Sequence, residues 1–173
     1  MSRTKLKVDG EETATNISTI EVTEKLVVNH RARAWCTLPY PDHPRGCPNY
    51  GRTGDCPPQA PHIEDWLDFS RPHWFITARF DLDRFATRMK SIHPTWSDRQ
   101  CRCCLYWQNS VRSRLSSSCK DFQKSNNGVA FTLRPEAMGI DVISTALALG
   151  IAIELKPRAT AHAIALLGYP RQS

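Results

Sequence analysis

The sequence predicts an α+β fold, in which helices pack on an antiparallel or mixed sheet and a long Pro/Gly-rich loop is inserted. Three features support this prediction: short segments that alternate as strands do, longer segments with helical periodicity, and one segment with neither pattern. The chain has 173 residues, of which 40% are apolar. That is enough to bury the core of one domain.

Strands are predicted where apolar and β-branched residues alternate between turn-forming residues. The predicted strands cover residues 17–28, 73–80, 129–133, 151–155 and 162–167. A helix is the alternative for the first of them. The turn signal Asn126-Asn127-Gly128 precedes the third strand, and Lys156-Pro157-Arg158 is expected to join the last two.

Helices are predicted where a capping residue precedes a helical pattern. Asp81, Ser97 and Asp141 are the expected N-caps of three of them, and Gly150 lies where a glycine commonly follows a helix. The predicted helices cover residues 63–69, 82–92, 97–122 and 141–149. A tight connection is expected over residues 134–139, with one helical turn as the alternative.

The domain organisation follows from composition. Residues 1–16 are polar and rich in Thr and Glu, so we expect a flexible N-terminal arm. Residues 17–173 are expected to form a single α+β domain, within which residues 36–61 are the cysteine loop.

The cysteine loop is dominated by Pro, Gly, Asn and Asp, which favour turns over regular structure. Long loops without regular structure are unusual inside compact domains unless they have a function. Cys36, Cys47 and Cys56 are spaced C-x10-C-x8-C, and two of them precede proline. Proline after a ligand stiffens the chain, and glycines let the backbone approach a cluster closely. We therefore predict that these cysteines bind metal.

The metal is predicted to be one [4Fe-4S] cluster, with zinc as the alternative. Zinc can be bound by Cys36, His43, Cys47 and Cys56, which are the right ligand types for a tetrahedral site. A cubane cluster takes up to four thiolates. In that case the fourth comes from outside the loop, or one iron stays open to substrate.

The cysteines outside the loop supply candidates for the fourth ligand. Cys101 and Cys104 would share one face of the predicted helix by their spacing. We prefer Cys104 as the fourth ligand and rank Cys101 second. Cys103 points elsewhere on such a helix, and Cys119 is expected to be structural, because buried free cysteine behaves as a small hydrophobe.

Three short motifs follow one another along the chain. They are Cys47-Pro48-Asn49-Tyr50-Gly51, Cys56-Pro57-Pro58 and Glu136-Ala137-Met138-Gly139-Ile140-Asp141-Val142. With these motifs the sequence resembles a family of small prokaryotic proteins described as predicted metal-binding proteins of unknown function, over about residues 36–167. The resemblance implies a metal or iron–sulfur centre and no settled reaction. Family members carry a ferredoxin-like cysteine group between the motifs, which is incomplete here, so a single centre is expected.

Charge and hydropathy limit the partners and the location. The net charge is +6, which permits an anionic partner such as nucleic acid or a nucleotide. No secretory signal is visible, and no apolar run reaches the roughly 18 residues that span a bilayer. We expect a cytoplasmic protein without a membrane partner. There, its seven cysteines suit metal ligands or thiols better than disulfides.

Basic and acidic residues add weaker hypotheses. Arg99, Arg102, Arg112 and Arg114 decorate the predicted helix 97–122 together with aromatic residues, a combination that suits phosphate and base contacts. A solvated helix face is the alternative explanation. Glu136 is expected to bind a helix end or a loop N–H group, and an acid–base role lacks an identified partner.

Two functions are therefore expected to compete. In the first, a [4Fe-4S] cluster performs redox or sulfur chemistry on a nucleotide or RNA, with a possible protein redox partner. In the second, zinc staples a module that binds nucleic acid or protein without catalysis. The sequence names no reaction, and it predicts neither oligomeric state nor substrate.

Overall fold

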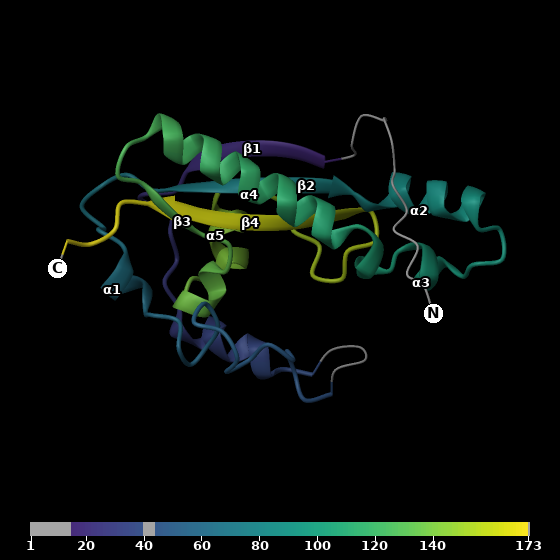
Figure 1. Cartoon of the computed structure of the whole chain (residues 1–173), viewed down its shortest axis with the longest axis horizontal. Coiled ribbons are helices and arrows are strands. Elements are labelled where there is room, and N and C mark those ends of the chain that lie inside the picture. The colour runs from purple at the N-terminus through teal and green to yellow at the C-terminus, as the bar shows by residue number, and fades with distance from the viewer. Residues whose placement is uncertain (1–14, 40–43, 173) are drawn as a thin grey trace.

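An antiparallel sheet is the centre of the structure, a computed structural model that describes residues 15–39 and 44–172 (Figure 1). Its strands are β1 (Thr15–Glu21), β2 (Trp74–Asp81), β3 (Ala130–Thr132) and β4 (Thr160–Gly168). They lie in the order β1-β2-β4-β3. The predicted α+β class is confirmed, and every strand pair is antiparallel.

Helices connect and cover these strands. They are η1 (His30–Thr37), α1 (Ile63–Trp66), α2 (Leu82–Ile92), α3 (Asp98–Cys101), η2 (Cys104–Tyr106), α4 (Gln108–Ser125), η3 (Pro135–Met138) and α5 (Val142–Ala148), where η marks a 3-10 helix. The predicted caps of α2 and α5 are confirmed. The Asp81 carboxylate accepts from the N–H of Arg84 at 2.9 Å, and Asp141 accepts from Ser144 at 2.9 Å.

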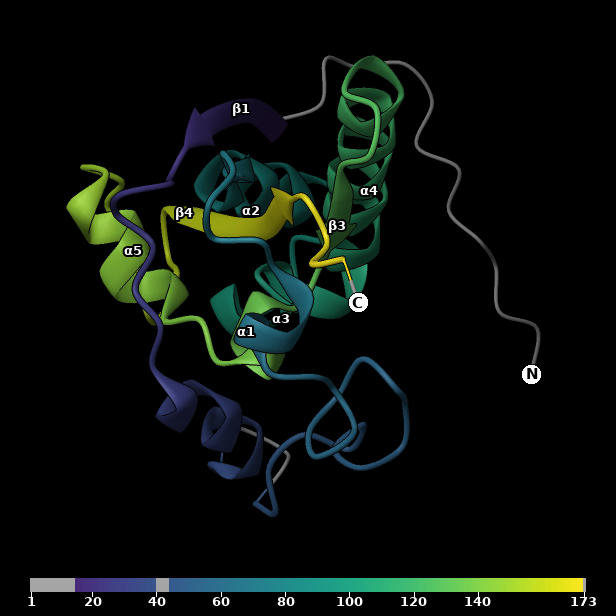
Figure 2. The same cartoon turned by 90° about the vertical axis from the view of Figure 1, so that its left-hand side faces the viewer.

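The two faces of the sheet are covered by different helices (Figure 2). Ile76 and Phe80 of β2 pack with Val111 and Leu115 of α4 on one face. Residues of opposite parity, such as Phe75, pack with a second core on the other face, because side chains alternate along a strand. That second core includes residues of α1, η3 and α5. The cysteine loop is therefore attached to the face opposite α4.

The predicted helix 97–122 is wrong in its first half. Ser97 does cap a helix, through a full capping box, but α3 ends at Cys101. Cys103 is extended, with φ −59° and ψ 124°. α4 begins only after Trp107, whose indole ring stacks on Phe80 with centroids 5.0 Å apart. This tertiary contact fixes the indole against the sheet and outweighs local helix propensity.

The predicted strand 151–155 is also wrong, because the described residues form no strand there. The Glu154 carboxylate instead accepts hydrogen bonds from the N–H groups of Arg158, Ala159 and Thr160, at 2.7 to 3.2 Å. The side chain thus organises a turn that leads directly into β4. The backbone donors that a hairpin would have paired are used locally.

The N-terminal boundary is shifted slightly from its prediction. Residues 1–14 of the expected arm lie outside the described residues, whereas Thr15 and Asn16 already belong to β1. Between residues 15 and 172, apart from 40–43, no helix is both long enough and apolar enough to span a bilayer.

Cys119 gives a test of the core between α4 and the sheet. It is fully buried, and burial raises the pKa of its thiol to about 12. An unfolded chain loses this proton near pH 8.5. The stability that Cys119 contributes is therefore complete below that pH and decreases as the pH rises toward 12.

We expect the unfolding free energy of the metal-free protein to fall by up to about 1 kcal/mol per pH unit between pH 9 and 11. Cys119→Ala should weaken this dependence, and Cys103→Ala, at a partly exposed thiol, should not. Urea titrations at each pH measure the difference. Parallel curves for wild type and Cys119→Ala would contradict the assignment.

Candidate metal centre

The cysteine loop is held to the rest of the domain by one arginine of η1. The Arg33 guanidinium donates hydrogen bonds to the carbonyl groups of Pro58, Ala60, Pro61 and Ala137, at 3.2, 2.8, 3.1 and 2.8 Å. Three of these acceptors belong to the end of the loop, and Ala137 belongs to η3. Arginine can satisfy several acceptors at once because its donors form a rigid planar fork. The four hydrogen bonds therefore hold the end of the loop against η1 and η3.

Backbone contacts inside the loop bring its cysteines together. The N–H of Cys47 donates to the carbonyl of Cys36 at 2.7 Å, which links the first two cysteines directly. Gly46 has φ +81°, and a Cβ there would lie 2.5 Å from the Cys36 carbonyl oxygen. Glycine is thus required at this turn. The N–H of Gly51 donates to the carbonyl of Pro57 at 2.8 Å and closes the turn that carries Cys56.

Cys36 is affected electrostatically by the other two predicted ligands of the loop. Cys56 is buried, and Cys36 and Cys47 are partly buried. The pKa of the Cys36 thiol is raised, first by burial and then by the negative charges of Cys47, Cys56 and Glu136. Arg134 lowers it in part. A cation bound among these groups would favour the deprotonated form of the Cys36 thiol.

The spacing of the sulfur atoms bears on the kind of metal that they bind. Within the described residues, the sulfurs of Cys36, Cys47 and Cys56 do not all lie within 4.8 Å of one another. Ligands of one tetrahedral zinc with Zn–S bonds of about 2.3 Å would lie about 3.8 Å apart. Ligands of a cubane cluster bind different irons and stand farther apart. Among the described residues, the three thiols therefore lack the spacing of ligands already gathered around one zinc ion, and a cluster stays a prediction. His43, the predicted fourth zinc ligand, lies outside the described residues.

The sequence did not predict that Glu136 would act on the cysteine loop. It lies in η3, held beside the loop by the Arg33 contact to Ala137. Burial raises the pKa of its carboxyl, and the positive charge of Arg112 partly opposes this. Its carboxylate acts on Cys36 from a position 100 residues later in the chain. In the sequence, only its position as the first residue of the late motif, directly after Pro135, singled out Glu136.

The remaining cysteines lie on other elements. Cys101 is buried against Ala86 and Met89 of α2, and Cys104 is exposed in η2. The predicted shared face of Cys101 and Cys104 is wrong, because the helix is broken between them. Cys104 is not among the groups whose charges act on Cys36. Its role as fourth ligand stays a prediction. Cys119 is in the core, as expected for a structural residue.

The predicted arginine surface is partly occupied by internal contacts. Arg102 pairs with Asp83 at 2.7 Å and with Asp98 at 2.9 Å, and these contacts raise its pKa. Trp107 is stacked in the core. The positive charge of Arg112 lowers the pKa of the Glu136 carboxyl in part. Fewer arginine and aromatic side chains are therefore available to contact nucleic acid than the sequence predicted.

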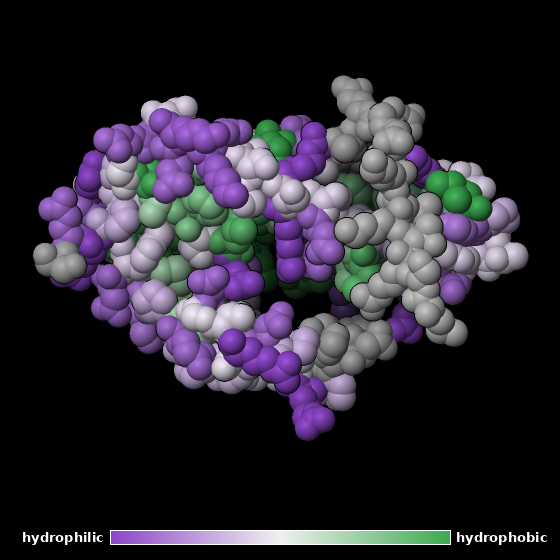
Figure 3. Space-filling view, viewed as in Figure 1, coloured by the Kyte–Doolittle hydropathy of each residue, from purple (hydrophilic) through white to green (hydrophobic). Residues whose placement is uncertain are grey.

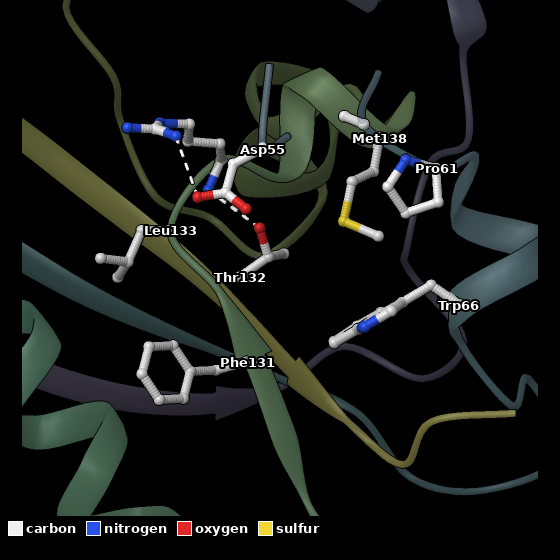
Figure 4. A pocket seen from close by; sticks show the side chains of 9 residues that line it. Asp55, Pro61, Trp66, Phe131, Thr132, Leu133 and Met138 are labelled. Carbon is white, nitrogen blue, oxygen red and sulfur yellow. Dashed lines mark hydrogen bonds and ion pairs between the residues drawn. The ribbon is translucent and has the colours of Figure 1, made fainter. Parts of the chain in front are cut away.

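A pocket of about 290 Å³ adjoins the cysteine loop (Figure 4). Trp66, Phe131 and Met138 supply apolar walls, while Arg134 and Asp55 pair at 3.2 Å across it. Asp55 directly precedes Cys56, so the pocket is continuous in sequence with the proposed ligands. In space-filling view the surface is hollowed between the sheet and the loop (Figure 3). The pocket therefore combines apolar walls with one internally paired cation.

Arg33→Lys tests the hydrogen bonds that hold the end of the loop. Lysine keeps the charge but cannot donate to four carbonyl groups in fork geometry. We expect the metal-free variant to lose about 1–3 kcal/mol of unfolding free energy, and the amides of Cys47 and Cys56 to exchange faster. Arg31→Lys, at an exposed arginine of the same helix, is the matched control. Unchanged amide exchange in Arg33→Lys would show that the loop is held by other contacts.

Comparison with known proteins adds no identification. No protein-family model matches the chain, and no curated protein or solved structure matches it. The function must therefore be argued from the residues themselves.

Proposed function

We propose that this protein binds one [4Fe-4S] cluster through Cys36, Cys47 and Cys56 and uses it for redox or sulfur chemistry. One observation carries the proposal. Backbone hydrogen bonds link Cys36 directly to Cys47 and close the turn that carries Cys56, and both Cys47 and Cys56 act electrostatically on the Cys36 thiol. A bound cluster would supply electrons or an open iron for the substrate. The chain supplies the thiolates, the partly buried carboxyl group of Glu136 and the neighbouring pocket.

Glu136 is a stronger candidate than Cys104 for the protein group at the fourth position. Its charge acts on Cys36, and burial disfavours its ionised form. A buried carboxyl beside a metal can either bind it or hold a proton near it. Arg112 and Arg134 balance the negative charge of this region.

The pocket supports a nucleotide-like substrate. Trp66 and Phe131 offer aromatic surface, and Arg134 offers a planar cation. This combination suits a base and its phosphate, whether free or part of RNA. The net charge of +6 agrees with an anionic substrate. Electrons for such chemistry would come from a protein redox partner.

Anaerobic metal analysis tests the cluster. Wild-type protein should contain iron and acid-labile sulfide in equal amounts and absorb near 400 nm. Cys36→Ala, Cys47→Ala and Cys56→Ala should each lose most of both, because thiolates hold the cluster. Cys103→Ala is the matched control and should keep them. Equal iron in all four variants would defeat the ligand assignment.

A colourless protein with stoichiometric zinc would contradict the cluster. It would instead support a zinc-stapled module that binds nucleic acid or protein without catalysis. In that case, RNA affinity should decrease steeply with added salt.

The fourth position has its own test. Cys104→Ala should keep the iron content and the spectrum of wild type. Glu136→Ala should keep iron under strictly anaerobic conditions but lose it at least several-fold faster to a chelator, because the cluster loses a neighbouring ligand-capable group. Loss of iron only in Cys104→Ala would return Cys104 to the site.

A further inference from the structure

A second group of metal-ligating side chains lies at the base of the cysteine loop. His30 opens η1, just before the loop, and His62 and Glu64 flank the start of α1, just after it. One nitrogen or oxygen atom of each lies within 4.8 Å of the other two. Among residues 15–39 and 44–172, this is the one group of three His, Cys, Asp or Glu side chains that meets this distance.

The two imidazole rings face each other through ring nitrogens. Nδ1 of His30 and Nδ1 of His62 are 3.0 Å apart, and the rings meet edge to face at an interplanar angle of 74°. Two nitrogens bound to one tetrahedral zinc, with Zn–N bonds of 2.0–2.1 Å, lie about 3.3 Å apart. The two rings are therefore about as close to each other as two ligands of one metal ion.

Glu64 adds a carboxylate to this pair. Its Oε1 is 2.9 Å from Nε2 of His30, so an ion held by all three side chains would lie on the Nε2 side of that ring. Its Oε2 is buried and has no hydrogen-bond partner within the described structure. A buried carboxylate oxygen without a partner is costly. A cation bound beside the histidines would satisfy it.

The backbone fixes the position of His30. The N–H of Asn29 donates to the carbonyl of Gly139 at 2.7 Å. Gly139 has φ +98°, and a Cβ at this residue would lie 2.6 Å from Nδ1 of His30. A glycine in the late motif therefore makes room for the imidazole. His62 is the N-cap residue of α1, yet its side chain caps no N–H group of the described chain and bonds to His30.

We propose that His30, His62 and Glu64 bind one divalent transition-metal ion, separate from the cluster on the cysteines. Two imidazoles and a carboxylate suit zinc or ferrous iron, which take this ligand set in sites with open positions. The side chains of His30 and Glu64 are 48% and 45% exposed, which leaves room for a water ligand. The ion would join the two ends of the cysteine loop and close its base.

Metal counting on the full chain tests this proposal. Wild-type protein, purified anaerobically and dialysed against Zn²⁺, should bind one zinc in addition to its iron. His62→Ala and Glu64→Gln should weaken this zinc at least tenfold and leave the iron unchanged. His93→Ala, which removes a histidine outside the group, is the matched control and should bind zinc as wild type does. Circular dichroism confirms that each variant is folded, and Glu64→Gln keeps the side-chain size.

Cobalt distinguishes this site from the cysteines. Co²⁺ bound by nitrogen and oxygen lacks the intense near-ultraviolet charge-transfer band that thiolate ligands produce. We expect the weaker spectrum in wild type and its loss in Glu64→Gln. Equal zinc in wild type, His62→Ala and Glu64→Gln, or a thiolate spectrum for the added ion, would overturn the proposal. Neither outcome bears on the iron content of the cysteine variants, so the two metal proposals can fail independently.

Discussion

The position of the cysteine loop depends on the hydrogen bonds of the Arg33 guanidinium group. A loop rich in proline has few N–H groups with which to bind to a sheet or helix, but it keeps all its carbonyl oxygens. Arg33 satisfies carbonyl oxygens of Pro58, Ala60 and Pro61 and links them to Ala137 of η3. Through this one side chain, an irregular segment and a late motif far away in sequence become parts of one site.

Two groups of potential metal ligands are therefore arranged in and around the cysteine loop. Glycine at position 46 allows the first two cysteines to approach through their backbones, and glycine at 139 allows His30 to lie against η3. The thiols of the loop and the Glu136 carboxyl form one group of potential ligands, whereas His30, His62 and Glu64 form another at the base of the loop. Soft thiolates and borderline imidazoles select different metals. The two groups need not compete for the same ion.

Local signals explain what the sequence could and could not predict. Helix α2 has its predicted bounds because Asp81 and His93-Pro94 mark its two ends. The start of α4 was missed because it depends on Trp107 stacking on Phe80, which no local pattern encodes. The strand at 151–155 was overridden by the Glu154 carboxylate. In the site, Cys36, Cys47 and Cys56 stand out by composition. Glu136 becomes part of the site only through the fold, because it lies 100 residues after Cys36 in the sequence. His30 and His62, which are 32 residues apart, likewise meet only through a tertiary contact.

The alternation of side chains along β2 has a consequence for how the protein unfolds. Ile76 and Phe80 belong to the core under α4, whereas Phe75 belongs to the core that carries the loop. One strand thus contributes to both cores, and its backbone pairs with β1 on one side and β4 on the other. Loss of either core exposes one face of β2 and so weakens the support of the strand on which the other core packs. We therefore expect the core that carries the cysteine loop and the core under α4 to unfold together in one cooperative transition.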